Sequence, residues 1–244
     1  QAAYDAAFAG RAERLVENVV EEALRKAELR RRLRSAGDTR PANVMTTPQD
    51  RLDLVEAALL VKSGRDVEMG NTAIREEADR PFRGGMFYIH DVMAAYLHAY
   101  DGLTPETRQA VRRSLSRVPL YRGDTENHWV LYYTGLYLAA QTWPDDPGTA
   151  WFNGKSAAEN RAEAQSFLEH WMRLTTTIGQ GEYDSPTYII VFLSPMFTLY
   201  TFCEDAALKE KARKMLDWLL ADYAAEYLKG LYAGAHSRDY SYDA

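Results

Sequence analysis

The sequence predicts an all-α protein built from helical hairpins as an α/α toroid, and three observations lead to that class. The 244 residues are 46% hydrophobic and 26% charged, which suits a soluble globular chain with a sizeable core. Only 15 glycines and 9 prolines occur, too few for a sandwich or barrel that turns about every ten residues. Finally, helices with one wet face alternate with helices that carry almost no charge.

The wet helices have apolar residues at i, i+3, i+4 and i+7 with charges between them, so we expect them on the outside. They are residues 10–36, 50–62, 105–117, 157–175 and 205–228. The dry helices are apolar or aromatic nearly all round, so we expect protein to enclose them on most sides. They are residues 87–100, 128–143 and 187–203. The last begins like a buried strand, but its length favours a helix with Ser185 as N-cap and Pro186 at the first helical position.

Pairs of a wet helix and a dry helix recur at intervals of roughly 40 to 60 residues, which is typical of an α-hairpin array. A closed ring of hairpins covers the dry helices on both flanks, whereas an open solenoid leaves a face exposed, so we expect the α/α toroid. About four hairpins are present, fewer than a closed toroid usually has, and we expect an incomplete ring. No linker rich in Pro, Gly or Ser divides the chain, so residues 1–244 are predicted to form a single domain.

Composition excludes several classes of function. The net charge of −6 argues against a large basic footprint for nucleic acid. No apolar stretch reaches the roughly 20 residues of a membrane span, so we expect no membrane partner. The single Cys203 excludes a disulfide framework and a cysteine zinc site. The start Gln1-Ala2-Ala3 carries no signal peptide and fits a mature end after signal cleavage, which predicts a periplasmic or secreted protein.

Four polar joints lead from a wet helix into the next dry helix. The first joint is residues 80–90, the second 121–128, the third 179–188 and the fourth 234–240. Because the helices alternate up and down, all four joints are expected at one end of the ring, with their side chains converging on its mouth. Four of the five histidines lie in or next to a joint or its dry helix: His90, His98, His128 and His236. The sequence thus gathers residues of catalytic type at one rim.

The second joint ends in Asn127-His128-Trp129. One interpretation is structural: Asn127 or Thr125 caps the helix and His128 fills its half-buried first turn. The other is functional, because an amide and an imidazole at a helix N-terminus can bind a carboxylate and handle a proton. A metal held by Asp124, Glu126 and His128 is not favoured, since there is no second histidine four residues on and no nearby cysteine. We expect neither metal nor cofactor.

The third joint offers two kinds of acid and base. Tyr183 or Tyr188 can act as an acid/base phenol if a neighbouring arginine or protonated histidine lowers its pKa from about 10. Glu182 and Asp184 can instead form the carboxylic pair of a glycoside hydrolase, which requires a separation of roughly 5 to 9.5 Å. The residues leave both interpretations open.

The fourth joint adds a second imidazole, a guanidinium and a phenol in His236, Arg238 and Tyr240. Arginine has the planar shape that binds a carboxylate through two hydrogen bonds. Arg83 and Arg122 stand in two other joints. An acidic chain has therefore concentrated cations where we expect its mouth to be.

This pattern resembles the polysaccharide lyases built on α/α toroids, especially those that act on alginate or glucuronan. The resemblance covers much of residues 80–244 and rests on Asn127-His128 before an aromatic residue, a tyrosine on the next joint, and Arg, His and Tyr on the joint after it. It implies β-elimination of a uronic-acid-containing polysaccharide or oligosaccharide. In such lyases an asparagine neutralises the uronate carboxylate, a histidine assists or is the base, and a tyrosine is the acid and often also the base.

Carried over, the resemblance assigns the carboxylate to Asn127 and the proton to His128, with Tyr188 favoured over Tyr183 because the first turn of a dry helix faces the mouth. Arg238 and His236 would add hydrogen bonds to the carboxylate, and removal of one such donor typically costs about 10²- to 10³-fold in rate. The remaining substrate-binding residues would be Tyr240, Glu182 and Arg122. Two rival functions stay open. One is a glycoside hydrolase on the same scaffold, using Glu182, Asp184, Asp124 or Glu126, and the other is a carbohydrate-binding protein without turnover.

Overall fold

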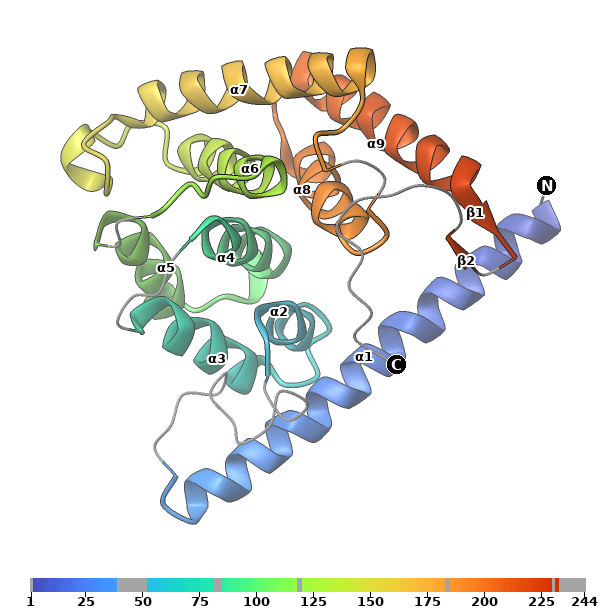
Figure 1. Ribbon diagram of the computed structural model, residues 1–244. Coiled ribbons are helices and arrows are strands. Elements are labelled where there is room, and N and C mark those ends of the chain that lie inside the picture. The colour runs from blue at the N-terminus through green and yellow to red at the C-terminus, as the bar shows by residue number, and fades with distance from the viewer. Residues whose placement is uncertain are drawn as a thin grey trace. The chain divides into compact units, whose positions relative to one another are not determined.

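A computed structural model describes residues 2–38, 52–80, 85–117, 120–182, 185–229 and 231–232. These residues form nine α-helices and one short antiparallel pair of strands, which confirms the all-α class (Figure 1). In chain order they are α1 (Ala2–Ser35), α2 (Leu54–Lys62), α3 (Val67–Asp79), α4 (Met86–Ala99), α5 (Pro105–Arg117), α6 (Glu126–Thr142), α7 (Ala157–Ile178), α8 (Ile189–Phe202), α9 (Ala206–Glu226), β1 (Tyr227–Leu228) and β2 (Leu231–Tyr232). Every helix expected from the sequence is present.

The structure corrects the expectation at two places. Helix α3 was not predicted; it starts at the N-cap Asp66, whose side chain accepts the Met69 N–H at 3.2 Å. Helix α8 begins at Ile189 with Tyr188 as N-cap, so Ser185 is not its N-cap and Pro186 is not its first residue. Instead, Ser185 accepts the Tyr188 N–H through both its hydroxyl and its carbonyl oxygen, at 3.2 Å each, which makes a separate turn before the helix.

The chain divides into two compact units, and the division falls within α4 and α5. The first unit comprises residues 1–82 and 94–114 and contains α1, α2 and α3. A buried ion pair of 2.5 Å between Lys26 of α1 and Glu56 of α2 joins two of its helices. Glu56 also forms a capping box with the N-cap residue Asp53. The Glu56 side chain therefore both stabilises the start of α2 and connects α2 to α1.

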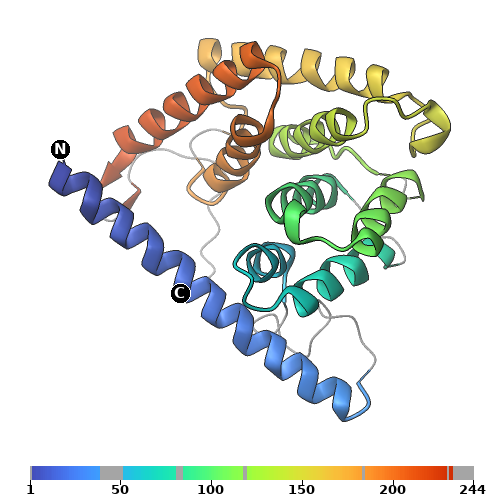
Figure 2. The ribbon, with the colours of Figure 1, turned by 180° about the vertical axis from the view of Figure 1, so that it is seen from behind.

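The second unit comprises residues 83–93 and 115–244 and consists mainly of two hairpins. Helix α6 pairs with α7, and α8 pairs with α9; in addition α6 contacts α8 and α7 contacts α9 (Figures 1 and 2). All residues from Val130 to Gln141 of α6 are buried, which confirms a dry helix enclosed by protein. For α8 that expectation is wrong on one side, because Ile190 is 61% and Phe197 56% exposed while α6 and α9 cover its other faces.

Gly135 lets α6 approach the start of α4. A methyl group added there would lie 2.7 Å from the carbonyl carbon and oxygen of Ile89. We expect Gly135→Ala to lower the free energy of unfolding by about 1–3 kcal/mol, because two backbones must separate. Urea denaturation of this variant beside Gly10→Ala checks the prediction. A methyl group added at Gly10 would lie 3.6 Å from the Arg14 guanidinium, an ordinary contact, so alanine there should stabilise α1 by up to ~1 kcal/mol. A Gly135→Ala protein as stable as wild type would contradict the account.

Tyr137 links α6 to α7 and to the residue after α8. Its side chain is fully buried, and its hydroxyl oxygen accepts a hydrogen bond of 3.1 Å from the Arg161 guanidinium. The Cys203 thiol lies 3.7 Å from the same oxygen. Burial raises the pKa of Tyr137 to about 12, which makes this residue a source of pH-dependent stability.

The fold should therefore lose stability in alkaline solution. Unfolded tyrosine loses its proton near pH ~10, before the folded one does, so stability from Tyr137 is complete below pH ~10 and falls as the pH rises towards 12. The slope approaches ~1.4 kcal/mol per pH unit for one such group. Thermal unfolding from pH 8 to 11.5 tests this. Tyr137→Phe should make the alkaline fall shallower without abolishing it, because burial also raises the pKa of Tyr132, whereas Tyr121→Phe, at a side chain 60% exposed, should leave the slope unchanged. Equal slopes in all three proteins would contradict the assignment.

Candidate active site

Three of the four joints touch one another in the described residues. Gly85 of the first joint forms a parallel bridge with Tyr121 of the second, and the Phe87 ring stands edge-on to His128 with 5.6 Å between ring centroids. Glu182 of the third joint hydrogen-bonds to Asn127 of the second. The second joint therefore contacts both the first joint and the third. The fourth joint, with His236, Arg238 and Tyr240, lies outside the described residues, as do Arg83, Tyr183 and Asp184.

The tight turn at Gly123 packs closely against the first turn of α6. Gly123 has a positive φ of 83°, and a methyl group added there would lie 2.5 Å from Cβ of His128. The Trp129 indole N–H donates to the Gly123 carbonyl oxygen at 2.9 Å, which holds this turn over the helix. Thr125 is the N-cap in extended conformation, and its carbonyl oxygen accepts the Trp129 N–H. The turn therefore fixes the position at which His128 leaves the helix.

The amide of Asn127 is engaged inside the protein. Asn127 is fully buried, and its backbone N–H donates to Oε2 of Glu182 at 3.0 Å. Its side-chain Nδ2 donates to the same oxygen and, at 3.2 Å, to the Thr125 hydroxyl. Glu182 is only 7% exposed. The functional interpretation expected this helix N-terminus to bind the carboxylate of a substrate; the carboxylate found there is that of Glu182 of the same chain.

This arrangement corrects the roles expected for two residues. Neither Asn127 nor Glu182 is open to a polymer in solution, because both are buried and bonded to each other. They join the second joint to the third instead of contacting substrate. Sequence reasoning missed the pairing because 55 residues separate the partners, and nothing in the spacing says which carboxylate reaches the helix.

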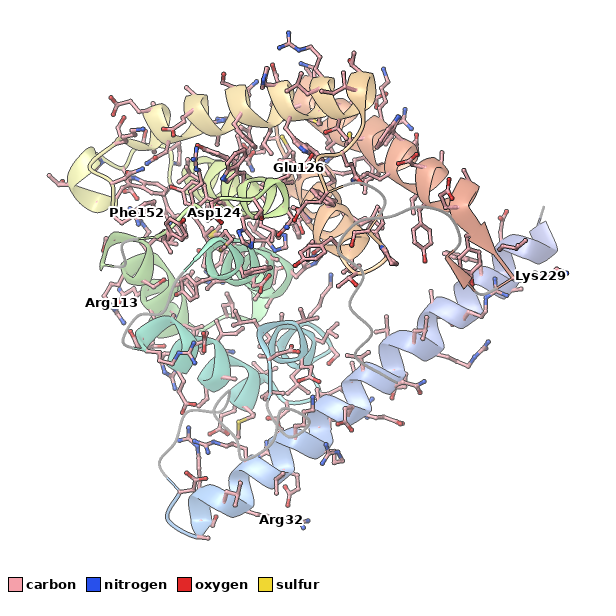
Figure 3. The ribbon with its side chains drawn as sticks, viewed as in Figure 1. Arg32, Arg113, Asp124, Glu126, Phe152 and Lys229 are labelled. Carbon is pink, nitrogen blue, oxygen red and sulfur yellow. The ribbon has the colours of Figure 1, made fainter. Side chains whose placement is uncertain are left out.

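Glu126 strengthens the same junction. Its Oε1 accepts the Trp171 indole N–H from α7 at 2.7 Å, and its Oε2 accepts the Glu182 backbone N–H at 2.9 Å. Glu126, the first residue of α6, is labelled in Figure 3. Both carboxylate oxygens thus already accept hydrogen bonds from the protein, and the side chain is only partly exposed. Trp171 lies on an outer helix, where no sequence signal marked it as a partner of the joints. Glu126 and Glu182 are therefore poorly placed to serve as the acid and base of a hydrolase.

His128 is an ionisable residue at this junction whose side chain is mostly enclosed by protein but still reaches solvent. Its side chain is 22% exposed, and Nδ1 lies 3.8 Å from Oδ1 of Asp124, whose side chain is 79% exposed. Nδ1 itself is buried and has no hydrogen bond among the described residues. At 3.8 Å the Asp124 contact is too long for a hydrogen bond, and the burial of Nδ1 leaves Nε2 as the ring nitrogen that a substrate can reach.

The other candidate residues differ in how far they are exposed. Arg122 is exposed, and its guanidinium carbon lies 4.8 Å above the Trp129 ring. Tyr188 is half-buried where the third joint meets α8. His90 does not reach the rim, because it is 3% exposed between Asp91 and Thr198, to which its ring nitrogens lie at 2.9 and 3.4 Å. Of the predicted site residues in the described joints, His128, Arg122 and Tyr188 are therefore the ones that remain exposed or partly exposed beside the exposed Asp124 and the partly exposed Glu126.

Comparison with other proteins adds no assignment: we found no matching family model, curated protein or solved structure. Within the described ranges, no helix is both long and apolar enough to cross a membrane. No group of three or more His, Cys, Asp and Glu side chains in those ranges is placed to hold a metal ion. The functional argument rests on the geometry of the joints.

Proposed function

We propose that the protein is a polysaccharide lyase that cleaves a uronic-acid-containing polymer of the alginate or glucuronan type by β-elimination. The observation that carries the proposal is the placement of His128, a partly enclosed imidazole at a helix N-terminus where the second joint contacts the first and the third. The exposed Arg122 of the same joint lies over the ring of the next residue, Trp129. We further propose that the hairpins belong to an α/α toroid, and that the enzyme works in the periplasm or outside the cell, where such polymers occur.

The chemistry explains why these groups are required. An ionised carboxylate makes the neighbouring C–H very weakly acidic, so its charge must be neutralised in the transition state. Arg122 supplies a cation for the carboxylate. Arg238, His236 and Tyr240 of the fourth joint also bind the substrate. His128 Nε2 takes the proton, the C–H electron pair becomes the new C=C bond, and the C–O bond to the leaving sugar breaks. Tyr188, or Tyr183 of the same joint, protonates the leaving oxygen.

Asn127 and Glu182 act as positioning residues in this proposal. Their hydrogen bonds hold the joint that carries Tyr183 and Tyr188 against the joint that carries His128. A base and an acid on separate loops need such a connection, since small displacements of reacting groups cost large factors in rate. The proposal thus gives the buried pair a function without substrate contact.

The test is to incubate the protein with polyglucuronate and with alginate and to follow two signals. A lyase raises the ultraviolet absorbance of an unsaturated uronate in step with new reducing ends. New reducing ends without that absorbance would show hydrolysis and overturn the proposal. Binding of either polymer with neither signal, across a broad range of pH, would show a carbohydrate-binding protein without turnover.

A further inference from the structure

A groove of about 780 Å³ lies between α7 and α9, in the second unit. Both views of the ribbon show the C-terminal half of α7 beside the N-terminal half of α9 (Figures 1 and 2). An ion pair of 3.0 Å between Lys211 of α9 and Glu169 of α7 connects the two walls. None of the residues that line the groove belongs to a joint, so this is a separate site from the one described above.

The groove is basic although the protein is acidic. Arg173, Lys211 and Lys214 line it against a single carboxylate, Glu169, in a chain whose net charge is −6. Glu169 is already held by Lys211 and by a hydrogen bond of 3.2 Å from Gln165, and these donors lower its pKa, so its charge persists at neutral pH. The local excess of positive charge therefore favours an anionic ligand.

Arg173 is the cation best placed to receive that ligand. Its guanidinium donates to the His170 ring nitrogen at 2.7 Å, which orients the group through an imidazole instead of a carboxylate. Lys214 lies 3.7 Å from Glu210, a looser pairing at an exposed position. Arg173 stands on one wall, and Lys211 and Lys214 stand one helical turn apart on the other. Cations spaced in this way suit charges repeated along a chain better than one compact phosphate.

The rest of the lining suits a sugar. Trp218 is the partly exposed apolar side chain of the lining, whereas Met172 and Met215 are buried, and an indole face packs well against the C–H face of a pyranose. Hydroxyl groups of Ser166 and Thr176 stand at the same groove. Its volume lies within the ~300–1,000 Å³ typical of ligand sites. Carboxylates for the cations, a flat apolar face and many hydroxyls are the features of a uronate chain.

We propose that this groove is a second, non-catalytic binding site for a short stretch of anionic polysaccharide of the uronate class. The identity of the polymer rests on the proposed function, whereas the existence of the site rests on the groove itself. Holding one segment of a long polymer here would raise the effective concentration of its other segments at the joints.

Binding of oligoglucuronate and oligoalginate tests the site, measured by titration calorimetry in a His128→Ala background that prevents cleavage. The triple variant Arg173→Gln, Lys211→Gln, Lys214→Gln should weaken binding by about 10- to 100-fold, since three exposed charge contacts are lost. Trp218→Leu should also weaken it. The matched control is Lys155→Gln, Lys209→Gln, Arg213→Gln, which removes the same charge from the same unit outside the groove and should change binding by less than about threefold.

Equal affinity in the groove and control variants would overturn the inference, and so would tighter binding of inorganic phosphate or a phosphopeptide than of the uronates. The outcome is separable from that of the proposed function. Groove-dependent binding by a protein that never cleaves a uronate polymer would keep the site and refute the lyase. Cleavage of a uronate polymer by a protein whose binding does not depend on the groove would support the lyase and refute the second site.

Discussion

Replacing His128 with alanine is expected to lower the rate of polymer cleavage by about 10²- to 10⁴-fold, the usual contribution of a general base. The reason is positional: His128 is the imidazole of the three described joints that is partly open, whereas His90 is buried. Initial rates of ultraviolet absorbance on polyglucuronate give the measurement. The effect should fall on kcat, with KM close to wild type, because the substrate carboxylate is bound by other groups.

Two controls separate catalysis from folding in the His128 experiment. Added imidazole should restore part of the activity of His128→Ala, which a merely destabilised protein would not show. His98→Ala removes a histidine of the first unit and should keep the wild-type rate. A His128→Ala enzyme within threefold of the wild-type rate would refute the assignment of the base.

Exchanging Asn127 for aspartate is expected to lower the free energy of unfolding by about 3–5 kcal/mol at pH 7, the typical cost of leaving a buried charge without its partner. The substitution replaces an amide donor by a second carboxylate against Glu182, where both positions are buried. The deficit should shrink as the pH falls, because two adjacent carboxylates can share a proton and the folded state then binds more protons than the unfolded one.

A swapped pair provides the rescue for Asn127→Asp. Adding Glu182→Gln restores an amide opposite a carboxylate with the roles exchanged, so the double variant should recover at least half of the lost stability. Urea denaturation of the two single variants and the double variant measures this coupling. Asn18→Asp, at an exposed asparagine of α1, is the matched control and should cost less than about 1 kcal/mol. Additive losses would show that Asn127 and Glu182 do not depend on each other.

The helices were predictable where the signals for them are local. Helix α5 starts and ends at the expected residues because Pro105 fits a first helical position. Helix α7 starts at its expected residue through a capping box between Ser156 and Glu159. Helix α3 escaped prediction because Gly70 and Asn71 interrupt its interior with poor helix formers, and because its apolar face becomes evident only against α2.

The connections of the site could not be predicted from the sequence. The functional interpretation expected the second joint to bind the carboxylate of a substrate, whereas the carboxylate found at this helix N-terminus is that of Glu182. Which carboxylate fills it depends on tertiary packing, which brings Glu182 to Asn127 and Trp171 to Glu126. Residue type and spacing carry no information about such distant partners. The start of α8 was predicted too early for a related reason. Ser185 accepts a backbone N–H in a separate turn, as it would if it were the N-cap of a longer helix.

The most direct test of the central claim is the mass of the products formed from a defined oligoglucuronate. Elimination consumes no water, so each cut should give two fragments whose masses add up to that of the parent, one of them absorbing in the ultraviolet. Fragments that together weigh one water more than the parent would mean that the bond is hydrolysed, and the account of His128 as the base of a β-elimination would be wrong.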